Sequence, residues 1–258
     1  MLFWNADPIL IQLGPIAVHW YGALFATGFL LGYQLMQRIY RQEGRPTEQL
    51  DKLLTYIFIG TVVGARLAHT LIYEPEYYLA HPIDILKIWE GGLASHGGGI
   101  GVLLAIWLFV RQHPENKFLW LADRLAIPTA LTGCFIRLGN FMNSEIIGNP
   151  TDGNWGVVFE RIDMLPRHPV QLYEAASYFT IFVLLLMLFR TTKSKQTGFL
   201  FGLFLTLVFA ARFIIEYFKT PQAAYEAGNL ISVGQWLSVP FVLAGIVLML
   251  LSAKKKAR

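Results

Sequence analysis

Charged side chains are scarce in this sequence of 258 residues: Asp, Glu, Lys and Arg make up 15%, whereas hydrophobic residues make up 55%. A soluble domain carries about a quarter charged residues, so this composition argues against a soluble fold. The low charge leaves long apolar runs, and a membrane-spanning helix needs roughly 20 predominantly apolar residues. Seven such runs are spaced along the chain, at about 15–37, 53–73, 93–110, 119–138, 170–189, 198–218 and 231–252. We therefore expect an all-α polytopic membrane protein with about seven transmembrane helices.

The sequence also lacks the residues that mark several other classes of protein. Its single cysteine, Cys134, excludes an intramolecular disulfide and a cysteine-based metal site, and its apolar surroundings predict an inert packing role. There is no basic helix face or RNA-binding motif, so no nucleic-acid partner is expected. The N-terminal stretch MLFWNADPILIQLG has no basic region of the kind that opens a secretory signal, so we expect no cleavable signal peptide.

Lys and Arg are distributed unevenly between the two sides of the expected spans. Thirteen of the 21 fall on one side, in 38–52, 111–118, 190–197 and 253–258, whereas four fall on the other. Cytoplasmic loops carry the excess of Lys and Arg, which predicts a cytoplasmic C-terminus and an N-terminus outside. We expect a single integral membrane domain over 1–258, in which the turn-rich segment 139–169 forms an extracytoplasmic cap. A short strand pair is expected within that cap, in WGVVFERIDMLPRHP.

Ionisable residues within the apolar runs gather near their outer ends. An arginine at the centre of a membrane helix costs roughly 2.5–3.5 kcal/mol, so each one needs a structural or functional reason. Arg137 closes the fourth run in RLGNFMNSEIIGNP, with Asn140 and Ser144 on the same helical face. Arg212 lies in the sixth run with Glu216 four residues on, a spacing that favours an ion pair. Two arginines at one depth suggest a phosphate site, with interfacial anchoring or a structural ion pair as the alternatives.

Further polar residues enter the membrane from the same side. His96 and Gly97 lie in GGLASHGGGIG, where glycines let the backbone approach a ligand and a histidine suits proton transfer near neutral pH. A structural role is the alternative for His96. Glu174 lies in RHPVQLYEA at the start of the fifth run, where a carboxylate favours a paired or functional role. Tyr21 lies in HWYG at the outer end of the first run, where an interfacial aromatic belt is the alternative.

Five segments, in the order HWYG, SHGGGIG, RLGNFMNSEIIG, RHPVQLYE and RFIIEYF, together resemble the bacterial prolipoprotein diacylglyceryl transferase family. The third segment is similar to the family signature G-N-x-x-N-x-E-x-x-G, and the residues at its fixed positions are Gly139, Asn140, Asn143, Glu145 and Gly148. No fixed position departs from that signature. The resemblance covers nearly the whole chain, although the outward segments are relatively short.

The resemblance implies transfer of the diacylglyceryl group of phosphatidylglycerol to the lipobox cysteine thiol of a prolipoprotein, giving a thioether and glycerol phosphate. It implies that Arg137 and Arg212 are essential, and it implicates Tyr21, His96, Asn140, Glu145, Gly148 and Glu216. The implied partners are phosphatidylglycerol, membrane lipid and the lipobox segment, and the implied location is the bacterial plasma (inner) membrane. Sulfur substitution at an sp³ carbon requires no metal and the sequence offers no metal-ligand set, so no cofactor or metal is expected.

The residues suggest a division of labour for this reaction. We expect Arg137 and Arg212 to hold the headgroup and to stabilise the charge of the leaving phosphate. His96 would take the thiol proton or position the group that does. The remaining polar residues would orient these groups or contact lipid: Asn140, Asn143 and Glu145 beside Arg137 and the glycerol, Glu216 beside Arg212, and Tyr21 at the lipid.

Three other functions use some of the same features. A lipid or anion transporter would use the same arginines, but it predicts polar residues in both leaflets and often an inverted repeat, and the inner halves here are apolar. An intramembrane hydrolase would need a serine–histidine, aspartate-pair or HExxH arrangement, which is absent from the sequence. A helix scaffold would not need a polar cluster confined to one depth. The transporter is therefore retained as the alternative to the transferase.

Overall fold

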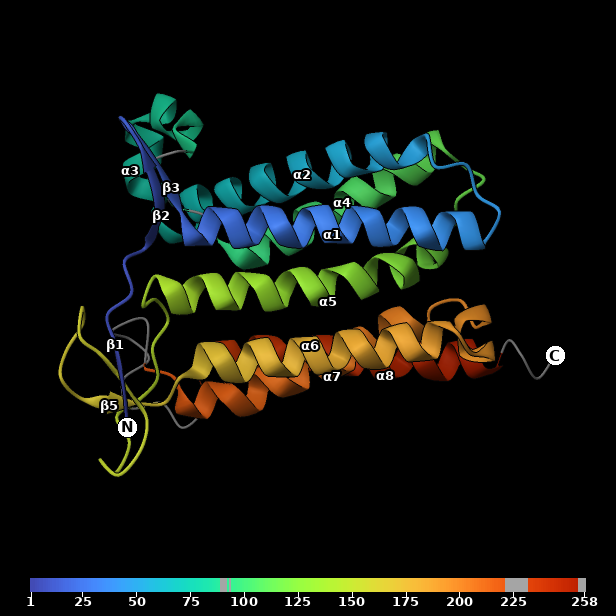
Figure 1. The fold of residues 1–258 in the computed structure, drawn as a ribbon. Coiled ribbons are helices and arrows are strands. Elements are labelled where there is room, and N and C mark those ends of the chain that lie inside the picture. The colour runs from blue at the N-terminus through green and yellow to red at the C-terminus, as the bar shows by residue number, and fades with distance from the viewer. Residues whose placement is uncertain (89–91, 93, 221–231, 255–258) are drawn as a thin grey trace. The chain divides into compact units, whose positions relative to one another are not determined.

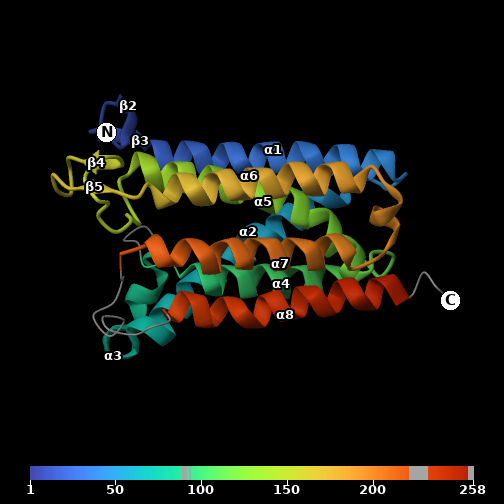
Figure 2. The same cartoon turned by 90° about the horizontal axis from the view of Figure 1, so that it is seen from below.

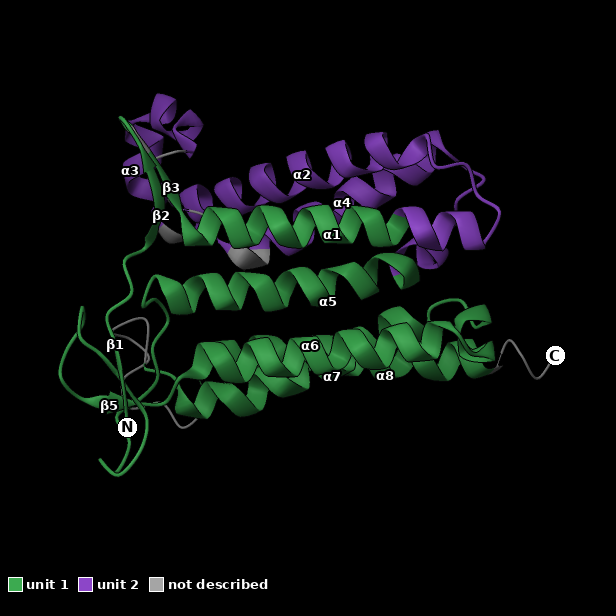
Figure 3. Ribbon diagram, viewed as in Figure 1, with its two compact units in different colours: residues 1–36, 123–258 green, residues 37–122 purple. Residues whose placement is uncertain are grey.

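The computed structural model describes residues 1–88, 92, 94–220 and 232–254. Within these ranges, six side chains lie outside the description: those of Ile16, Tyr73, Ser95, His96, Val233 and Lys254. The chain divides into two compact units, a larger one formed by 1–36 with 123–258 and a smaller one formed by 37–122 (Figure 3). Every strand among the described residues belongs to the larger unit.

Seven helices of at least 17 residues make up most of the described structure (Figure 1). They are α1 (Trp20–Gln42), α2 (Gln49–Ala68), α4 (Ser95–Gln112), α5 (Phe118–Met142), α6 (Val170–Phe189), α7 (Phe199–Ile215) and α8 (Val233–Lys254). Each of the seven expected spans overlaps one of them, so the all-α polytopic membrane fold is confirmed. Five described stretches are long and apolar enough to cross a membrane: Gln49–Ile72, Phe118–Met142, Val170–Phe189, Phe199–Phe218 and Gly234–Ala253. A shorter apolar stretch, Gly97–Gln112, lies in α4.

In the smaller unit, α2 packs closely against α4 because glycines line the contact. The GxxxG spacing of Gly60 and Gly64 predicts such an approach between membrane helices. A Cβ on Gly60 would lie 2.8 Å from the Cβ of Ala105. A Cβ on Gly64 would lie 2.9 Å from the Cα of Gly101, which is backbone and cannot rotate away. The packing role predicted for this pair is therefore confirmed.

The other GxxxG pair, Gly28 and Gly32, plays the same part in the larger unit. A Cβ on Gly28 would lie 3.2 Å from the Cα of Thr132, and one on Gly32 would lie 3.2 Å from the Cβ of Pro128. The close approach also lets the hydroxyl of Thr132 donate a hydrogen bond to the carbonyl oxygen of Gly28 at 3.2 Å. These glycines therefore fix α1 against α5, the helix that carries Arg137.

The segment after α2 in the smaller unit is a series of short helices held by a buried arginine. These are the π-helical turn η1 (His69–Tyr73), α3 (Pro75–Ala80) and the 3₁₀ turn η2 (Pro82–Leu86). The guanidinium of Arg66, 3% exposed, donates to the carbonyl oxygens of Asp84 at 2.5 Å and Ile85 at 2.9 Å. It also donates to the carbonyl oxygen of Gly92 at 3.3 Å. A buried arginine satisfied by backbone carbonyls has a structural role, which here is to hold this segment against α2.

A small sheet forms the cap of the larger unit. Its strands are β1 (Leu2–Trp4), β4 (Val157–Phe159) and β5 (Pro166–Arg167), in the order β1-β4-β5. Strand β4 runs parallel to β1 and antiparallel to β5. A separate antiparallel hairpin pairs β2 (Ile9–Leu13) with β3 (Ile16–His19). The strand pair expected within the cap segment is confirmed as β4 and β5.

The residue boundaries of the cap differ from those expected. Apolar side chains attach the cap to the end of α5. Phe141 of α5 forms a buried cluster with Val157 and Phe159, and Trp4 of β1 packs on that cluster. The indole nitrogen of Trp4 also donates a hydrogen bond to the carbonyl oxygen of Phe141 at 3.1 Å. The N-terminal strand therefore belongs to the cap, whereas 139–142 belong to the helix.

Several helices begin or end at the cap end of the larger unit. Helix α5 ends there, α6 begins, α7 ends and α8 begins, because consecutive helices run in opposite directions (Figures 1 and 2). Helix α7 passes directly into the 3₁₀ turn η5 (Glu216–Phe218). An isolated bridge pairs Gly148 with Lys219, and the backbone N–H of Asn149 donates to the carbonyl oxygen of Phe218 at 2.8 Å. The segments after α5 and α7 are thereby held together, along with their polar side chains.

Candidate active site

Arg137 lies on the last two turns of α5 and contacts two partners. Its Nε lies 2.8 Å from Oε2 of Glu174, a fully buried carboxylate on the first turns of α6. Its Nη1 donates a hydrogen bond to the amide oxygen of Asn140 at 3.2 Å, one helical turn further along α5. The shared helical face predicted for Arg137 and Asn140 is confirmed. The ion pair neutralises the guanidinium and fixes its direction.

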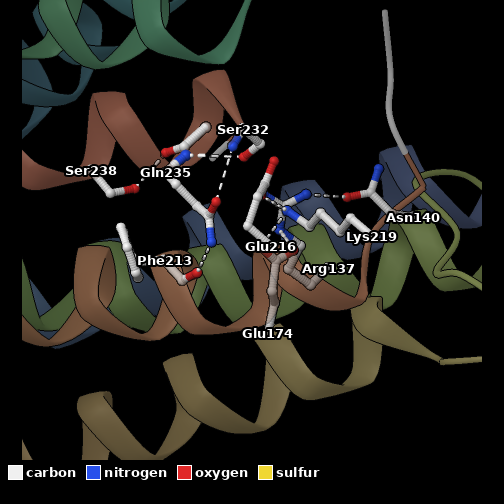
Figure 4. A network of polar contacts seen from close by, with 10 residues as sticks. Arg137, Asn140, Glu174, Phe213, Glu216, Lys219, Ser232, Gln235 and Ser238 are labelled. Atoms are coloured by element: carbon white, nitrogen blue, oxygen red, sulfur yellow. Dashed lines mark hydrogen bonds and ion pairs between the residues drawn. The ribbon is translucent and has the colours of Figure 1, made fainter. Parts of the chain in front are cut away.

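Glu174 also binds a second cation, Lys219, a residue that was not among those predicted for the site. The Nζ of Lys219 lies 2.9 Å from Oε1 of Glu174 and 3.1 Å from Oε2 of Glu216. Lys219 is 8% exposed, because the segment after α7 folds back over the start of α6. The four groups form a continuous chain of ion pairs, Arg137–Glu174–Lys219–Glu216 (Figure 4).

The residues after α5 fold Glu145 back onto the helix end. Ser144 and Ile146 have positive φ values of 57° and 54°, a left-handed conformation that is uncommon for side chains other than glycine, and rarest for a β-branched one. The exposed carboxylate of Glu145 then accepts hydrogen bonds from the side-chain amides of Asn140 at 3.0 Å and Asn143 at 3.1 Å. Backbone strain of this kind is often concentrated at functional sites.

Ser144 lies outside the helix, although it was expected on the same helical face as Arg137. Helix α5 ends at Met142, so Ser144 does not continue the helical face of Arg137. Its side chain is buried, and its hydroxyl has no hydrogen-bond partner among the described residues. A further contact closes this region: the side-chain amide of Gln171 on α6 donates to the carbonyl oxygen of Glu145 at 2.6 Å.

Arg212 lies on the last turn of α7. Its Nε is buried and has no hydrogen-bond partner among the described residues. The ion pair expected between Arg212 and Glu216 is not formed, because Glu216 begins the 3₁₀ turn and contacts Lys219 instead. The phenol of Tyr178 on α6 interacts electrostatically with both arginines.

Tyr21 and Gly148 each contact a segment that carries site residues. Tyr21, on the first turn of α1, packs against Gly139, where an added Cβ would lie 2.9 Å from its ring. Tyr21 also interacts electrostatically with Glu145 and Arg137. A Cβ on Gly148 would lie 2.8 Å from the carbonyl oxygen of Phe218, so this glycine allows two backbone segments to meet.

Two residues predicted for the site, His96 and Gly97, belong to the smaller unit at the start of α4. The side chain of His96 lies outside the described residues. Gly97 is buried and packs against Gly64 and Ala68 of α2. The larger unit holds all the other predicted site residues, which are Tyr21, Arg137, Asn140, Asn143, Glu145, Gly148, Glu174, Arg212 and Glu216.

This arrangement suits the binding of an anion. In the chain of ion pairs two cations balance two carboxylates, so Arg212 adds a positive charge beyond that balance. A buried donor without a partner costs about 1–3 kcal/mol, which a ligand that accepts its hydrogen bond would recover. In the described part of the chain, no three His, Cys, Asp or Glu side chains lie close enough together to hold a metal ion.

Comparison with known proteins assigns the chain to a family. Residues 8–251 match the family model for prolipoprotein diacylglyceryl transferase. A phosphatidylglycerol–prolipoprotein diacylglyceryl transferase of Tolumonas auensis is 98% identical over 258 residues, covering 100% of both chains. Proteins of the same name from Chloroherpeton thalassium and Bacteroides fragilis are 49% and 42% identical; each alignment covers 98% of this chain, and 95% and 96% of theirs. The chain therefore belongs to the prolipoprotein diacylglyceryl transferase family.

Proposed function

We propose that this chain transfers the diacylglyceryl group of phosphatidylglycerol to the lipobox cysteine of prolipoproteins. The observation that carries the proposal is the pair of arginines, Arg137 and Arg212, which lie at the ends of α5 and α7 and both interact electrostatically with the phenol of Tyr178. A guanidinium group matches phosphate oxygens in a bidentate manner, and the site has a free donor on Arg212. Membership of the family supports the same activity.

The reaction replaces a carbon–oxygen bond by a carbon–sulfur bond. The cysteine sulfur attacks the glycerol carbon that carries the phosphate ester, the thiol gives up its proton, and glycerol phosphate departs. The leaving phosphodiester becomes a monoester and gains negative charge. Arg212 and Arg137 would stabilise that charge in a site of low dielectric constant, where fixed charges act more strongly than in water.

The other residues would prepare these groups for reaction. A thiol with a pKa of about 8.5 is mostly protonated at pH 7, so a base or a positive field must favour the thiolate. His96 would accept that proton or position the group that does, with Gly97 allowing close approach of the backbone. Glu174 would orient Arg137, and Glu216 would act through Lys219.

The residues around Arg137 would complete the substrate site. Asn140 and Asn143 both bind Glu145, and this set would orient the guanidinium and the glycerol of the substrate. Tyr21 would contact the lipid from α1. Gly148 would permit the backbone turn that keeps the site closed on the cap side.

The chain is a multi-pass membrane protein, and its orientation is part of the proposal. We infer that it spans the bacterial plasma (inner) membrane as a single domain, with the N-terminus and the cap outside and the C-terminus in the cytoplasm. The support is the excess of Lys and Arg on the side of 38–52, 111–118, 190–197 and 253–258. This orientation would place the arginines in the outer leaflet, where an exported precursor exposes its lipobox.

Reconstitution tests the proposed transfer directly. The protein is inserted into phosphatidylglycerol vesicles with a lipobox peptide, and the mass of the peptide is followed. The expected result is a mass gain of one diacylglyceryl group on the cysteine, lost in Arg137→Ala and Arg212→Ala. Movement of labelled phosphatidylglycerol between leaflets with no change in peptide mass would instead support a lipid transporter.

A further inference from the structure

The start of α8 is fixed by a reciprocal pair of hydrogen bonds. The hydroxyl oxygen of Ser232 accepts from the backbone N–H of Gln235 at 3.2 Å, and the side-chain oxygen of Gln235 accepts from the backbone N–H of Ser232 at 3.0 Å. This is a capping box, in which a Ser and a Gln three residues apart satisfy donors that the first helical turn leaves free. The first turn of α8 is therefore a rigid support.

Gln235 has a second function that a glutamate at the same position could not perform. Its side-chain NH₂ donates to the carbonyl oxygen of Phe213 on α7 at 3.2 Å (Figure 4). Phe213 is among the last four residues of α7, one residue after Arg212. Because Gln235 is 2% exposed, water does not compete freely for this bond. One side chain thus connects the start of α8 to the end of α7.

Gly234, next to Gln235, lets the first turn of α8 lie directly against Glu216. A Cβ on Gly234 would lie 2.5 Å from Oε1 and 2.7 Å from Cδ of Glu216, so a larger residue there would displace the carboxylate from its present position. The N-terminal end of a helix carries partial positive charge, which favours a carboxylate at that place. The first turn of α8 therefore contacts the end of α7 on both sides of Ile215.

We propose that Gln235 is a positioning residue for diacylglyceryl transfer, an inference that rests on the proposed function. Phe213 follows Arg212 directly, and the Nε of Arg212 has no partner among the described residues that would fix its direction. The direction of Arg212 then depends on the backbone of the last turn of α7. Gln235 holds this turn of α7 through its hydrogen bond to the carbonyl oxygen of Phe213. It thereby sets the position at which the guanidinium of Arg212 meets the phosphate.

Two substitutions at Gln235 separate this role from the capping of α8. Gln235→Glu keeps an oxygen for the cap but removes the donor to Phe213. Gln235→Met removes both groups without adding charge, and keeps the test usable if a buried carboxylate unfolds the protein. Ser232→Ala weakens the cap and leaves the donor in place. Ser238→Ala is the matched control, because among the described residues the buried hydroxyl of Ser238 bonds only to the carbonyl oxygen of Gly234 within its own helix.

The experiment measures peptide lipidation in phosphatidylglycerol vesicles, per folded molecule, as kcat and as KM for the lipid. Misplacement of a group that acts in the transition state lowers kcat more than it changes KM, so we expect about a tenfold fall in kcat for both Gln235 variants. KM should stay within about twofold, as should both constants for Ser232→Ala and Ser238→Ala.

Three results would overturn the inference in different ways. If wild type lipidates the peptide and the folded Gln235 variants keep its kcat, Gln235 serves stability alone and the positioning role is wrong. If wild type itself gives no lipidated peptide, the proposed transfer is wrong, and the inference falls with it. A fall in kcat that Ser232→Ala shares to the same degree would assign the effect to capping and also reject the positioning role.

Discussion

The carboxylate of Glu174 joins a cation on α5 to one in the segment after α7: its Oε2 lies 2.8 Å from Nε of Arg137, and its Oε1 lies 2.9 Å from Nζ of Lys219. Glu174 is completely buried, and an isolated buried carboxylate would be strongly unfavourable. Its two oxygens are therefore both occupied by positive charge. This one side chain couples the end of α5 to the segment that follows α7.

Removal of the Lys219 ammonium group should destabilise the protein and slow the transfer reaction. Lys219→Met leaves Glu174 and Glu216 without one of their partners, and breaking a buried ion pair costs about 3–5 kcal/mol. We expect a lower unfolding temperature in detergent and a slower peptide lipidation in vesicles. Lys219→Arg keeps the charge and several donors, so it should retain most of the wild-type unfolding temperature and most of the lipidation rate. Equal stability of Lys219→Met and wild type would show that the two ion pairs are not formed in the membrane.

Neutralising Glu174 should reduce activity by releasing Arg137. Glu174→Gln removes the charge that orients the guanidinium, and loss of a preorganised electrostatic contact of this kind costs about 100-fold in kcat. Glu160→Gln is the control, because Glu160 is an exposed acid next to β4 in the cap. The transfer rate of each variant in phosphatidylglycerol vesicles measures the effect.

The double variant tests whether Glu174 and Lys219 act as one unit. Glu174→Gln combined with Lys219→Met restores the balance of charge that each single change disturbs. Residues in direct contact show coupling energies of about 0.5–3 kcal/mol, so the double variant should unfold at a higher temperature than additivity predicts. Strictly additive unfolding free energies would indicate that the two side chains do not interact.

The cap should lose stability in acid because of Asp163. A side-chain hydrogen bond from Arg167 holds the pKa of Asp163 below its usual value. A group with a lowered folded pKa contributes stability that is present above its unfolded pKa, about 4, and is lost as the pH falls through the folded pKa. The unfolding temperature of wild type should therefore fall more steeply below about pH 4 than that of Asp163→Asn.

Asp152→Asn provides the comparison for this pH dependence. Asp152 lies on the same cap and accepts a hydrogen bond from the backbone N–H of Asn154 at 3.2 Å, with no arginine contact among the described residues. The unfolding temperature of Asp152→Asn should therefore fall with pH as steeply as that of wild type. Parallel slopes for wild type and Asp163→Asn would show that the Asp163–Arg167 pair does not contribute to the acid sensitivity of the fold.

The sequence predicts those parts of this structure that depend on local spacing. Apolar runs of about 20 residues predict the helices, because the length of a span is fixed by the membrane. The contact of Arg137 with Asn140 follows from their separation of one helical turn. The contacts of Gly60 and Gly64 follow from the same periodicity. Each of these predictions concerns one helix or one helix face.

The partners that cross between helices could not be predicted in this way. Lys219 lies after a helix end, where a lysine usually faces solvent, and only the folded chain shows that it meets Glu174, 45 residues earlier. The pairing of Glu216 with Lys219 follows from a change to a 3₁₀ turn that the helical spacing from Arg212 does not reveal. The spacing of Glu216 and Lys219, three residues apart, was the one local signal available.

Replacement of Gly148 should disrupt the site through its backbone. A Cβ there would lie 2.7 Å from the Cβ of His168 and 2.8 Å from the carbonyl oxygen of Phe218, and a backbone atom cannot move aside as the end of a side chain can. Gly148→Ala should separate the segments after α5 and α7, where Lys219 bridges to Gly148. We expect at least about a tenfold loss of transfer rate, since small displacements of reacting groups are costly.

A second glycine supplies the control for that change. Gly22 lies in α1, and a Cβ there would have no atom within 4 Å, so Gly22→Ala adds a methyl group without a clash. Alanine is also favoured over glycine within a helix by about 1 kcal/mol. Gly22→Ala should therefore keep the wild-type rate and unfold at the same or a higher temperature. Retention of full lipidation activity by Gly148→Ala would mean that the two segments need not meet for transfer, and that the chain Arg137–Glu174–Lys219–Glu216 forms without this backbone contact.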